Sequence, residues 1–423
     1  MHSPLSRIEQ PVGNPIPDRV WGGEFLIVAT LAVLLLGDHQ LSRALATALV
    51  LAVFIFARLP VRFFLLGLAL PLQHALLLVP GVTIFTALVP LLIGSRLITR
   101  QLTLPPLKHV VLVGLFLSVS AFSGIHAAPA GGIDWKEFIN FAALMVVVLL
   151  CRDWMLCPEP KLPFWRGLLW SVAISATVGG LLSVRELMQF DPLSYRFDGY
   201  RLDPNYFASF CAIAAAALMY LDALATPRLR VALLCLFHVA AALTFSKTGL
   251  ALFGAVWLLY AFDAYAGTIR PIRHSLPLAA LALVFVVLEG TLVSSFSTRF
   301  NTGGDVLSGR SLLYLAFWDA WTSSRYRVAF GCGIGCQNSL LEDSFFGMSE
   351  FLHSGYLEIL AALGLVGALP FVWLVRLLYS EKRYATTNLP YAAMLRTVAA
   401  IILISSLTLS QAFRKTVWLL FLV

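Results

Sequence analysis

The stretch 309–367 begins Gly309-Arg310-Ser311-Leu312-Leu313, and it closes with His353-Ser354-Gly355-Tyr356-Leu357-Glu358 and Leu363-Gly364-Leu365-Val366-Gly367. It connects a polar loop at residues 291–353 to an apolar run, in a chain that is otherwise mostly apolar. An arginine stands near the start of the stretch, and a histidine stands where the apolar run begins. Charged groups are costly to hold beside a bilayer, so their presence here indicates a function.

The chain as a whole has the composition of a membrane protein. Of its 423 residues, 59% are hydrophobic and 12% are charged, and the mean hydropathy is +0.85. A soluble domain has about 25% charged residues. Several apolar runs reach the roughly 17–25 residues of a spanning helix once their flanks are included. The runs cover residues 25–36, 44–57, 63–78, 82–93, 110–121, 138–150, 168–182, 207–221, 231–245, 250–262, 276–288, 356–374 and 398–409.

These runs predict an all-α polytopic membrane protein, a bundle of 12–14 transmembrane helices. Residues 1–21 are polar and lack the basic-then-apolar start of a signal peptide, so we expect a cytoplasmic N-terminal segment there. Residues 22–423 are then a single transmembrane domain, whose large loop at 291–353 lies on the outer side.

With this orientation, one alternating set of loops is rich in lysine and arginine, as the positive-inside rule requires. That set contains Arg58, Arg62, Arg96, Arg100, Lys108, Arg152, Arg166, Arg228, Arg230, Arg270, Arg273, Lys382 and Arg383. The net charge of +8 is therefore mostly a consequence of topology. It gives no reason to expect nucleic acid as a partner.

The large loop is predicted to contain two amphipathic helices that lie on the membrane surface. Residues 310–321 place Leu313, Phe317 and Trp321 on one helical face. Residues 339–351 carry a similar apolar face, and a Gly-rich turn joins the two helices. The second face consists of Leu341, Phe345 and Met348, and the turn covers residues 331–335. Such helices would cover a lateral opening in the bundle as well as pack against it.

Two of the six cysteines, Cys332 and Cys336, belong to this turn. They fall on the predicted outer side, where a disulfide can form. Their spacing alone leaves open whether they are bonded or are two free, small loop residues. No spacing typical of a zinc site occurs in the chain.

Six cations depart from the positive-inside pattern, because they fall on the predicted outer side. They are Arg185, Arg196, Arg201, Lys247, Arg299 and Arg310. Any one of them has an ordinary explanation, since interfacial side chains snorkel to water or pair with a nearby carboxylate. As a group they suit a phosphate or pyrophosphate, which guanidinium forks and lysine ammonium groups bind. We therefore predict that Arg201, Lys247 and Arg310 contact a pyrophosphate, with Arg185 and Arg196 as further substrate-binding residues.

His353 is a candidate general base, because a histidine of ordinary pKa, about 6.5, accepts protons near neutral pH. Tyr356 lies three residues further on the same helical face and is a candidate substrate contact. The alternative for His353 is a helix-capping or buried, hydrogen-bonded histidine.

Asn205, in Asp203-Pro204-Asn205, is a candidate contact to a sugar hydroxyl or phosphate oxygen. Aspartate or asparagine before a helix is also a natural N-cap, and the cap is the interpretation we favour.

Ionisable residues in the middle of the predicted spans are scarce, with His238 the main one and Glu289 near a segment end. A proton-coupled transporter usually needs an embedded carboxylate or a carboxylate–histidine relay. A lipid or polysaccharide transporter therefore remains an alternative with less support. The outer carboxylates are scattered and lack metal-ligand spacing, so we predict neither a metal nor a cofactor.

Four motifs together resemble the bacterial O-antigen ligase and O-antigen polymerase superfamily. In chain order they are Asp203-Pro-Asn-Tyr-Phe-Ala208, Phe245-Ser-Lys-Thr-Gly249, Gly309-Arg310 and the run from His353 to Gly367, and they cover about the C-terminal 60% of the chain. The resemblance implies an inner-membrane glycosyltransferase that works at the periplasmic face on undecaprenyl-pyrophosphate-linked glycans. Ligases pass the glycan to a lipid A–core oligosaccharide, and polymerases pass it to a second lipid-linked repeat unit.

The residues and the resemblance together predict an O-antigen ligase that is inverting and metal-independent. Arg201, Lys247 and Arg310 would hold the pyrophosphate, and His353 would take the proton from the acceptor hydroxyl. The family usually has arginine where this chain has Lys247, which keeps the charge but loses the fork geometry. The polymerase is the first alternative, because donor chemistry is shared. The amphipathic helices favour the ligase, since they suit a bulky acceptor embedded in lipid.

Overall fold

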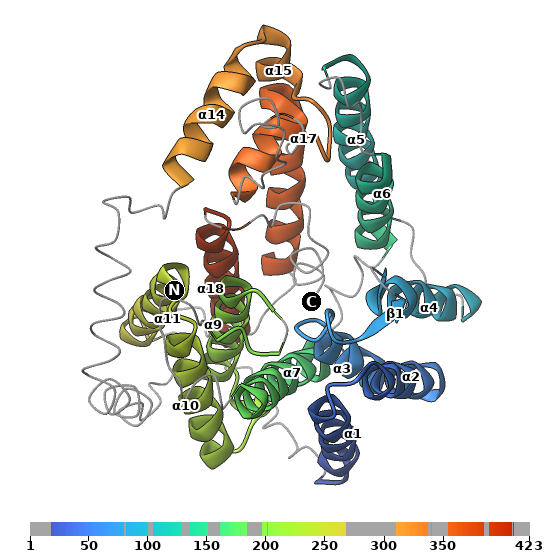
Figure 1. Cartoon of the computed structure of the whole chain (residues 1–423), viewed down its shortest axis with the longest axis vertical. Helices are drawn as coiled ribbons and strands as arrows, with labels where there is room; N and C mark the ends of the chain where they lie inside the picture. The colour runs from blue at the N-terminus through green and yellow to red at the C-terminus, as the bar shows by residue number, and fades with distance from the viewer. Residues whose placement is uncertain are drawn as a thin grey trace, which may run out of the picture.

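A computed structural model of the chain is almost entirely helical (Figure 1). It describes residues 18–79, 82–99, 105–127, 135–150, 161–183, 197–200, 202–267, 310–336, 340, 354–384, 389–407 and 409. Within these residues the prediction of an all-α fold is confirmed. The extended structure there is a short antiparallel pair, β1 (Leu77–Val79) and β2 (Val82–Thr83).

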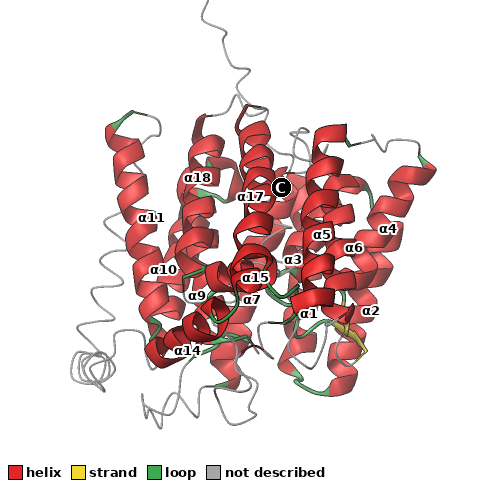
Figure 2. Ribbon diagram, turned by 90° about the horizontal axis from the view of Figure 1, so that it is seen from above, coloured by secondary structure: helices red, strands yellow, loops and turns green. Residues whose placement is uncertain are grey.

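The helices follow the predicted apolar runs in order. The N-terminal ones are α1 (Asp18–Leu36), α2 (Gln40–Phe56), α3 (Leu59–Ala69), α4 (Phe85–Ile98), α5 (Leu107–Ala127), α6 (Trp135–Leu150) and α7 (Lys161–Leu182). The later ones are α9 (Pro204–Tyr220), the 3₁₀ turn η2 (Asp222–Leu224), α10 (Pro227–Leu243), α11 (Lys247–Tyr265), α14 (Arg310–Thr322), α15 (Arg325–Phe330), α17 (Gly355–Tyr384) and α18 (Leu389–Ser405). Most of them stand side by side in Figure 2, and α14 lies across them near the lower end.

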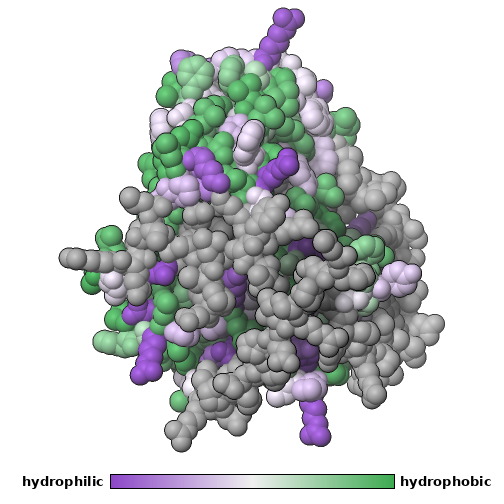
Figure 3. All heavy atoms as spheres, turned by 180° about the vertical axis from the view of Figure 1, so that it is seen from behind, coloured by the Kyte–Doolittle hydropathy of each residue, from purple (hydrophilic) through white to green (hydrophobic). Residues whose placement is uncertain are grey.

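Four helical stretches in the described part of the chain are long and apolar enough to cross a membrane. They are Leu107–His126, Lys161–Leu182, Lys247–Tyr265 and Gly355–Ser380. Large apolar side chains are also exposed, including Phe56 at 88% and Trp373 at 66%. Apolar side chains cover much of the upper part of the face in Figure 3, over the region of α5 and α17. Length, composition and this surface indicate a membrane protein.

The structure differs from the sequence prediction at α3. The apolar run 63–78 predicts one continuous segment, but α3 ends at Ala69 and the chain then turns into β1. Pro71 explains the end, because a proline two residues on lacks the N–H that would continue the helix. The apolar residues beyond it, such as Leu72 and Leu76, are buried within the turn.

Arg166, predicted to lie in a cytoplasmic loop, is instead within α7 and is 4% exposed. Its guanidinium pairs with the carboxylate of Glu24 on α1 at 2.9 Å. A buried cation next to an apolar bundle needs such a partner. The pair therefore connects α1 to α7.

Helices α3 and α7 cross at Gly67 and Gly167. A Cβ added at Gly67 would overlap the Phe164 carbonyl oxygen, and one added at Gly167 would overlap the Phe64 carbonyl oxygen. Small residues at such a crossing let two backbones approach closely, which is how helices pack in lipid. The residues of α3 from Phe63 to Ala69 are all buried, so α3 lies inside the bundle.

We predict that Gly67→Ala destabilises the protein, because the added methyl group must push the two backbones apart. The expected loss is about 1–3 kcal/mol, the usual cost of overpacking. Thermal unfolding of the purified protein in detergent measures it. Gly114→Ala on α5 is the matched control, since a Cβ there meets nothing within 4 Å. Equal melting temperatures for the two variants would contradict the crossing.

Candidate functional site

Two of the predicted motifs, separated by 41 residues, meet at the starts of α9 and α11. The Ser246 hydroxyl donates a hydrogen bond to Asn205 Oδ1 at 2.7 Å. Asp203 is the N-cap of α9, as the sequence predicts, and its Oδ1 accepts from the backbone N–H of Asn205 at 2.8 Å. Asn205 therefore connects the two helix starts through its side chain, while Asp203 provides the cap.

The start of α11 is a tight junction between two apolar helices. Phe245 has a positive φ of 49°, and Ser246 is the N-cap whose hydroxyl accepts from Gly249 N–H at 2.9 Å. A Cβ added at Gly249 would lie 2.8 Å from Ala208 Cβ on α9, so the glycine allows the two helices to touch. Lys247 is the first residue of α11. Its ammonium group therefore belongs to the end of the helix where the backbone dipole is already positive.

The ends of α14, α17 and α18 form a second group of contacts. The Gly355 N–H, at the start of α17, donates to the carbonyl oxygens of Ser406 and Leu409 at 2.8 and 3.0 Å. The Tyr356 hydroxyl donates to the Leu403 carbonyl at 2.9 Å. The Tyr314 hydroxyl on α14 donates to the Leu407 carbonyl at 3.3 Å. The starts of α14 and α17 are thus held against the end of α18.

These two groups lie at the same end of the bundle, because α18 runs antiparallel to α9 and α11. The opposite ends of α9 and α11 meet α18 near its middle, at Arg396 and Thr397. There the Tyr220 hydroxyl donates to Asp263 Oδ2 at 2.8 Å, and Arg396 forms an ion pair with Asp263. The Thr397 hydroxyl donates to the Tyr220 oxygen at 3.1 Å. In Figure 2, α11 and α18 run in opposite directions, so the end of α18 lies toward the starts of α9 and α11.

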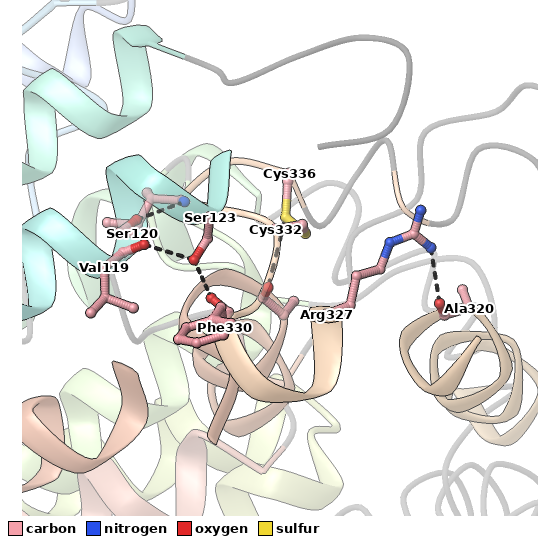
Figure 4. Close-up of a disulfide and its surroundings, with 10 residues drawn as sticks. Val119, Ser120, Ser123, Ala320, Arg327, Phe330, Cys332 and Cys336 are labelled. Atoms are coloured by element: carbon pink, nitrogen blue, oxygen red, sulfur yellow. Dashed lines mark hydrogen bonds between the residues drawn. A yellow bond between two sulfur atoms is a disulfide. The ribbon is translucent and has the colours of Figure 1, made fainter. Parts of the chain in front are cut away.

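A disulfide between Cys332 and Cys336 fixes the turn that follows α15 (Figure 4). The sequence left this bond open. The Cys332 and Gly333 N–H groups donate to the carbonyl oxygens of Ala361 and Ala362 at 2.8 and 2.9 Å. These carbonyls are free to accept because α17 breaks at Gly364, where φ is 58° and ψ is −169°. Gly364 is buried, and irregular backbone in membrane proteins is tolerated where it is buried in protein.

The same turn also packs on α5. The Ser120 hydroxyl accepts from the Ile334 N–H at 3.1 Å, and the Ser123 hydroxyl donates to the Phe330 carbonyl. Leu313, Phe317 and Trp321 of α14 are 7%, 0% and 5% exposed, and they pack in one cluster with the two disulfide cysteines. The predicted apolar face of the first loop helix is therefore confirmed. Helix α15 is an element that the sequence did not predict.

The second predicted loop helix, at 339–351, lies outside the described residues except for Leu340, which is buried. Four predicted site residues also lie outside them: His353, Arg201, Arg196 and Arg185. Of Arg310 the structure describes the backbone position, as the first residue of α14. The described side chains are those of Lys247, Asn205 and Tyr356. Asn205 and Lys247 share one helix junction, and Tyr356 is on the α17 start at the same end of the bundle.

His238 has a structural place in the bundle. Its Nδ1 donates to the Leu234 carbonyl at 2.7 Å, and its Nε2 accepts from the Trp257 indole N–H at 2.9 Å. Both ring nitrogens are therefore used by a neutral imidazole, which leaves none for a proton relay.

The sequence reasoning missed Asp263 and Arg396, a carboxylate and a guanidinium within apolar helices. Tyrosine and aspartate at the ends of two apolar runs were the available signal.

No group of three or more histidine, cysteine, aspartate or glutamate side chains that could hold a metal ion occurs among the described residues. No family model matches the chain, and comparisons with curated proteins and with solved structures also found no match.

We predict that Ser246→Ala destabilises the protein by about 1–2 kcal/mol, the upper range for loss of an N-cap. The substitution removes the acceptor of the Gly249 N–H and the donor to Asn205 Oδ1 together. Thermal unfolding in detergent measures the loss. Ser209→Ala on α9 is the control, because that buried serine bonds to the Asn205 carbonyl one turn earlier in its own helix, a contact that contributes little. A Ser246→Ala protein as stable as the control would refute the junction.

Proposed function

We propose that the protein is a membrane glycosyltransferase of the O-antigen ligase type. It transfers a glycan from undecaprenyl pyrophosphate to a lipid A–core oligosaccharide acceptor. The observation that carries the proposal is the hydrogen bond from Ser246 to Asn205, because it joins two of the four motifs on which the resemblance rests. The start of α14 and the start of α17, which lie within the other two motifs, belong to the same end of the bundle.

The electrostatics of this end support a pyrophosphate ligand. The starts of α9 and α11 meet there, and each helix start has a partial positive charge from its aligned peptide dipoles. Lys247 adds a full positive charge to the start of α11. Anions bind at helix starts for this reason. In the proposal Arg310 and Arg201 complete the set of cations, with Arg185 and Arg196 contacting the glycan or its pyrophosphate.

The proposed reaction is a single displacement. His353, which directly precedes Ser354 in the chain, takes the proton from an acceptor hydroxyl. The acceptor oxygen then bonds to the anomeric carbon from the face opposite the leaving group, while the bond from that carbon to the pyrophosphate oxygen breaks. The configuration inverts, and undecaprenyl pyrophosphate leaves with its electron pair. Arg201, Lys247 and Arg310 stabilise the charge that develops on it, so the step requires no metal.

In this proposal the chain spans a bacterial inner membrane as a bundle of 12–14 helices, and the site faces the periplasm. Helix α14 lies across the bundle (Figure 2). Its residues Leu313, Phe317 and Trp321 are buried in one cluster. We propose that α14 is one of two surface helices beside which the lipid tails of donor and acceptor enter, while the glycans remain in water.

The O-antigen or exopolysaccharide polymerase is the first alternative, with a second lipid-linked glycan as acceptor. It uses the same donor chemistry and the same residues. A lipid or polysaccharide transporter is the second alternative. Both ring nitrogens of His238 are hydrogen-bonded, which argues against it as a proton carrier. The buried Asp263 is an embedded carboxylate of the kind that a proton-coupled transporter uses.

We predict that His353→Ala lowers the rate of glycan transfer by about 100-fold or more, the usual contribution of a general base. The assay follows transfer from lipid-linked glycan in membranes that contain equal amounts of inserted protein. His126→Ala, at the exposed end of α5, is the matched control and should keep full activity. A His353→Ala protein with normal activity would remove this residue as the base.

We predict opposite outcomes for two conservative changes of the cations. Arg310→Lys should reduce transfer about 10-fold or more, because a point charge replaces two parallel hydrogen bonds to a phosphate. Lys247→Arg should leave transfer unchanged or raise it, because a guanidinium keeps the charge and adds a fork. The same membrane assay measures both. Full activity of Arg310→Lys would show that attraction of charge alone suffices there.

A further inference from the structure

An apolar groove lies between α2 and α4, on a part of the bundle that the proposed reaction does not use. Its volume is about 620 Å³, within the roughly 300–1,000 Å³ typical of small-molecule sites. Phe54 and Ile55 on α2 form one wall, and Leu91 and Ile98 on α4 form the other. Arg62 of α3 also lines the groove. A groove that is apolar apart from one cation is complementary to an amphipathic ligand with a negatively charged head group.

The groove exists because α4 presents small residues along one face. Ala87, Pro90 and Gly94 recur there at helical spacing and line the groove. A Cβ added at Gly94 would meet nothing within 4 Å, so protein atoms do not fill this space. Of the large side chains that line it, Ile55, Leu91 and Ile98 are exposed, Ile98 at 83%, while Phe54 is buried. In a membrane, these exposed side chains face acyl chains.

Arg62 supplies the polar end of the groove. Its Nη2 donates to the Ile55 carbonyl at 3.0 Å, and its guanidinium lies 5.8 Å from the centre of the Phe54 ring. Arg62 is the one charged residue among the described residues that line the groove. A phosphate oxygen beside its guanidinium would form a charge-assisted bond.

We propose that this groove binds an anionic phospholipid, with one acyl chain between α2 and α4 and the phosphate at Arg62. Arg58 and Arg96 belong to the same ends of α2 and α4, which the positive-inside pattern assigns to the cytoplasm. Basic pockets between membrane helices on that side recognise anionic head groups. The inference depends on the groove and its arginine, and it holds whether or not the protein transfers glycans.

Native mass spectrometry of the purified full-length protein tests the proposal. Dioleoylphosphatidylglycerol and dioleoylphosphatidylcholine serve as probes with identical acyl chains. The wild-type protein should retain one phosphatidylglycerol at least 5-fold more strongly than phosphatidylcholine. Gly94→Leu, which fills the groove, should lower retention at least 5-fold. Gly254→Leu on α11 is the matched control and should retain the lipid, since a Cβ there also meets nothing within 4 Å.

A second pair of variants tests the head group. Arg62→Gln should abolish the preference for phosphatidylglycerol, while Arg228→Gln, an exposed arginine on α10 outside the groove, should keep it. Thermal unfolding in detergent should be similar for all four variants.

Equal lipid retention by Gly94→Leu and Gly254→Leu would overturn the proposal. If Gly94→Leu changed the oligomeric state without losing lipid, the groove would be a contact site for a second copy of the chain. Stronger binding of undecaprenyl phosphate than of phosphatidylglycerol would assign it to the carrier lipid, and both results also overturn the proposal.

Discussion

Polar contacts at the two ends of α9 and α11 decide how the C-terminal helices are arranged. At one end Asp263, which is 1% exposed, binds the Tyr220 hydroxyl and the Arg396 guanidinium. At the other end Ser246 binds Asn205. Polar groups inside an apolar bundle have few other partners, so each of these bonds is costly to break. The Ser246–Asn205 bond holds the starts of α9 and α11 together, and the Asp263 contacts hold their other ends against α18.

A second constraint follows from the break in α17. Gly364 interrupts the helix, and the carbonyls released there accept the N–H groups of the turn that the disulfide closes. This turn also binds α5 through Ser120 and Ser123. The start of α17 is therefore held from both sides, by the disulfide turn and by the end of α18. A residue placed at this start, as the proposal requires of His353, would have a well-supported position for chemistry.

The sequence predicts much of the fold because lipid makes the hydrophobic pattern simple. Apolar runs long enough to span a bilayer become helices, and the Asp203 cap and the buried face of α14 follow from local rules. Where sequence reasoning fails, tertiary contacts decide. Pro71 ends α3 inside an apolar run, and α15 is a short helix with weak periodicity. The ion pair of Asp263 with Arg396 joins residues that are 133 positions apart, so no local pattern reports it.

The candidate site was predictable only as a set of residue types on one side of a membrane. Positive-inside counting singles out Lys247 and Arg310, but it says nothing of which helix ends meet. The structure shows which helix ends meet. Asn205 and Ser246 join the starts of α9 and α11, and Gly355 joins the start of α17 to the end of α18. The result is a cluster of helix starts at one end of the bundle. In the proposed function, this cluster binds the pyrophosphate of the donor.

The most direct test of this account is the product that the purified wild-type protein makes. The protein is mixed with a lipid-linked glycan and lipid A–core oligosaccharide, with a chelator present, and the products are separated by mass. The account predicts that the glycan moves to the lipid A–core and that undecaprenyl pyrophosphate is released in equal amount. A lengthened lipid-linked polymer would favour the polymerase. Absence of any new glycosidic bond, with the protein folded, would contradict the account.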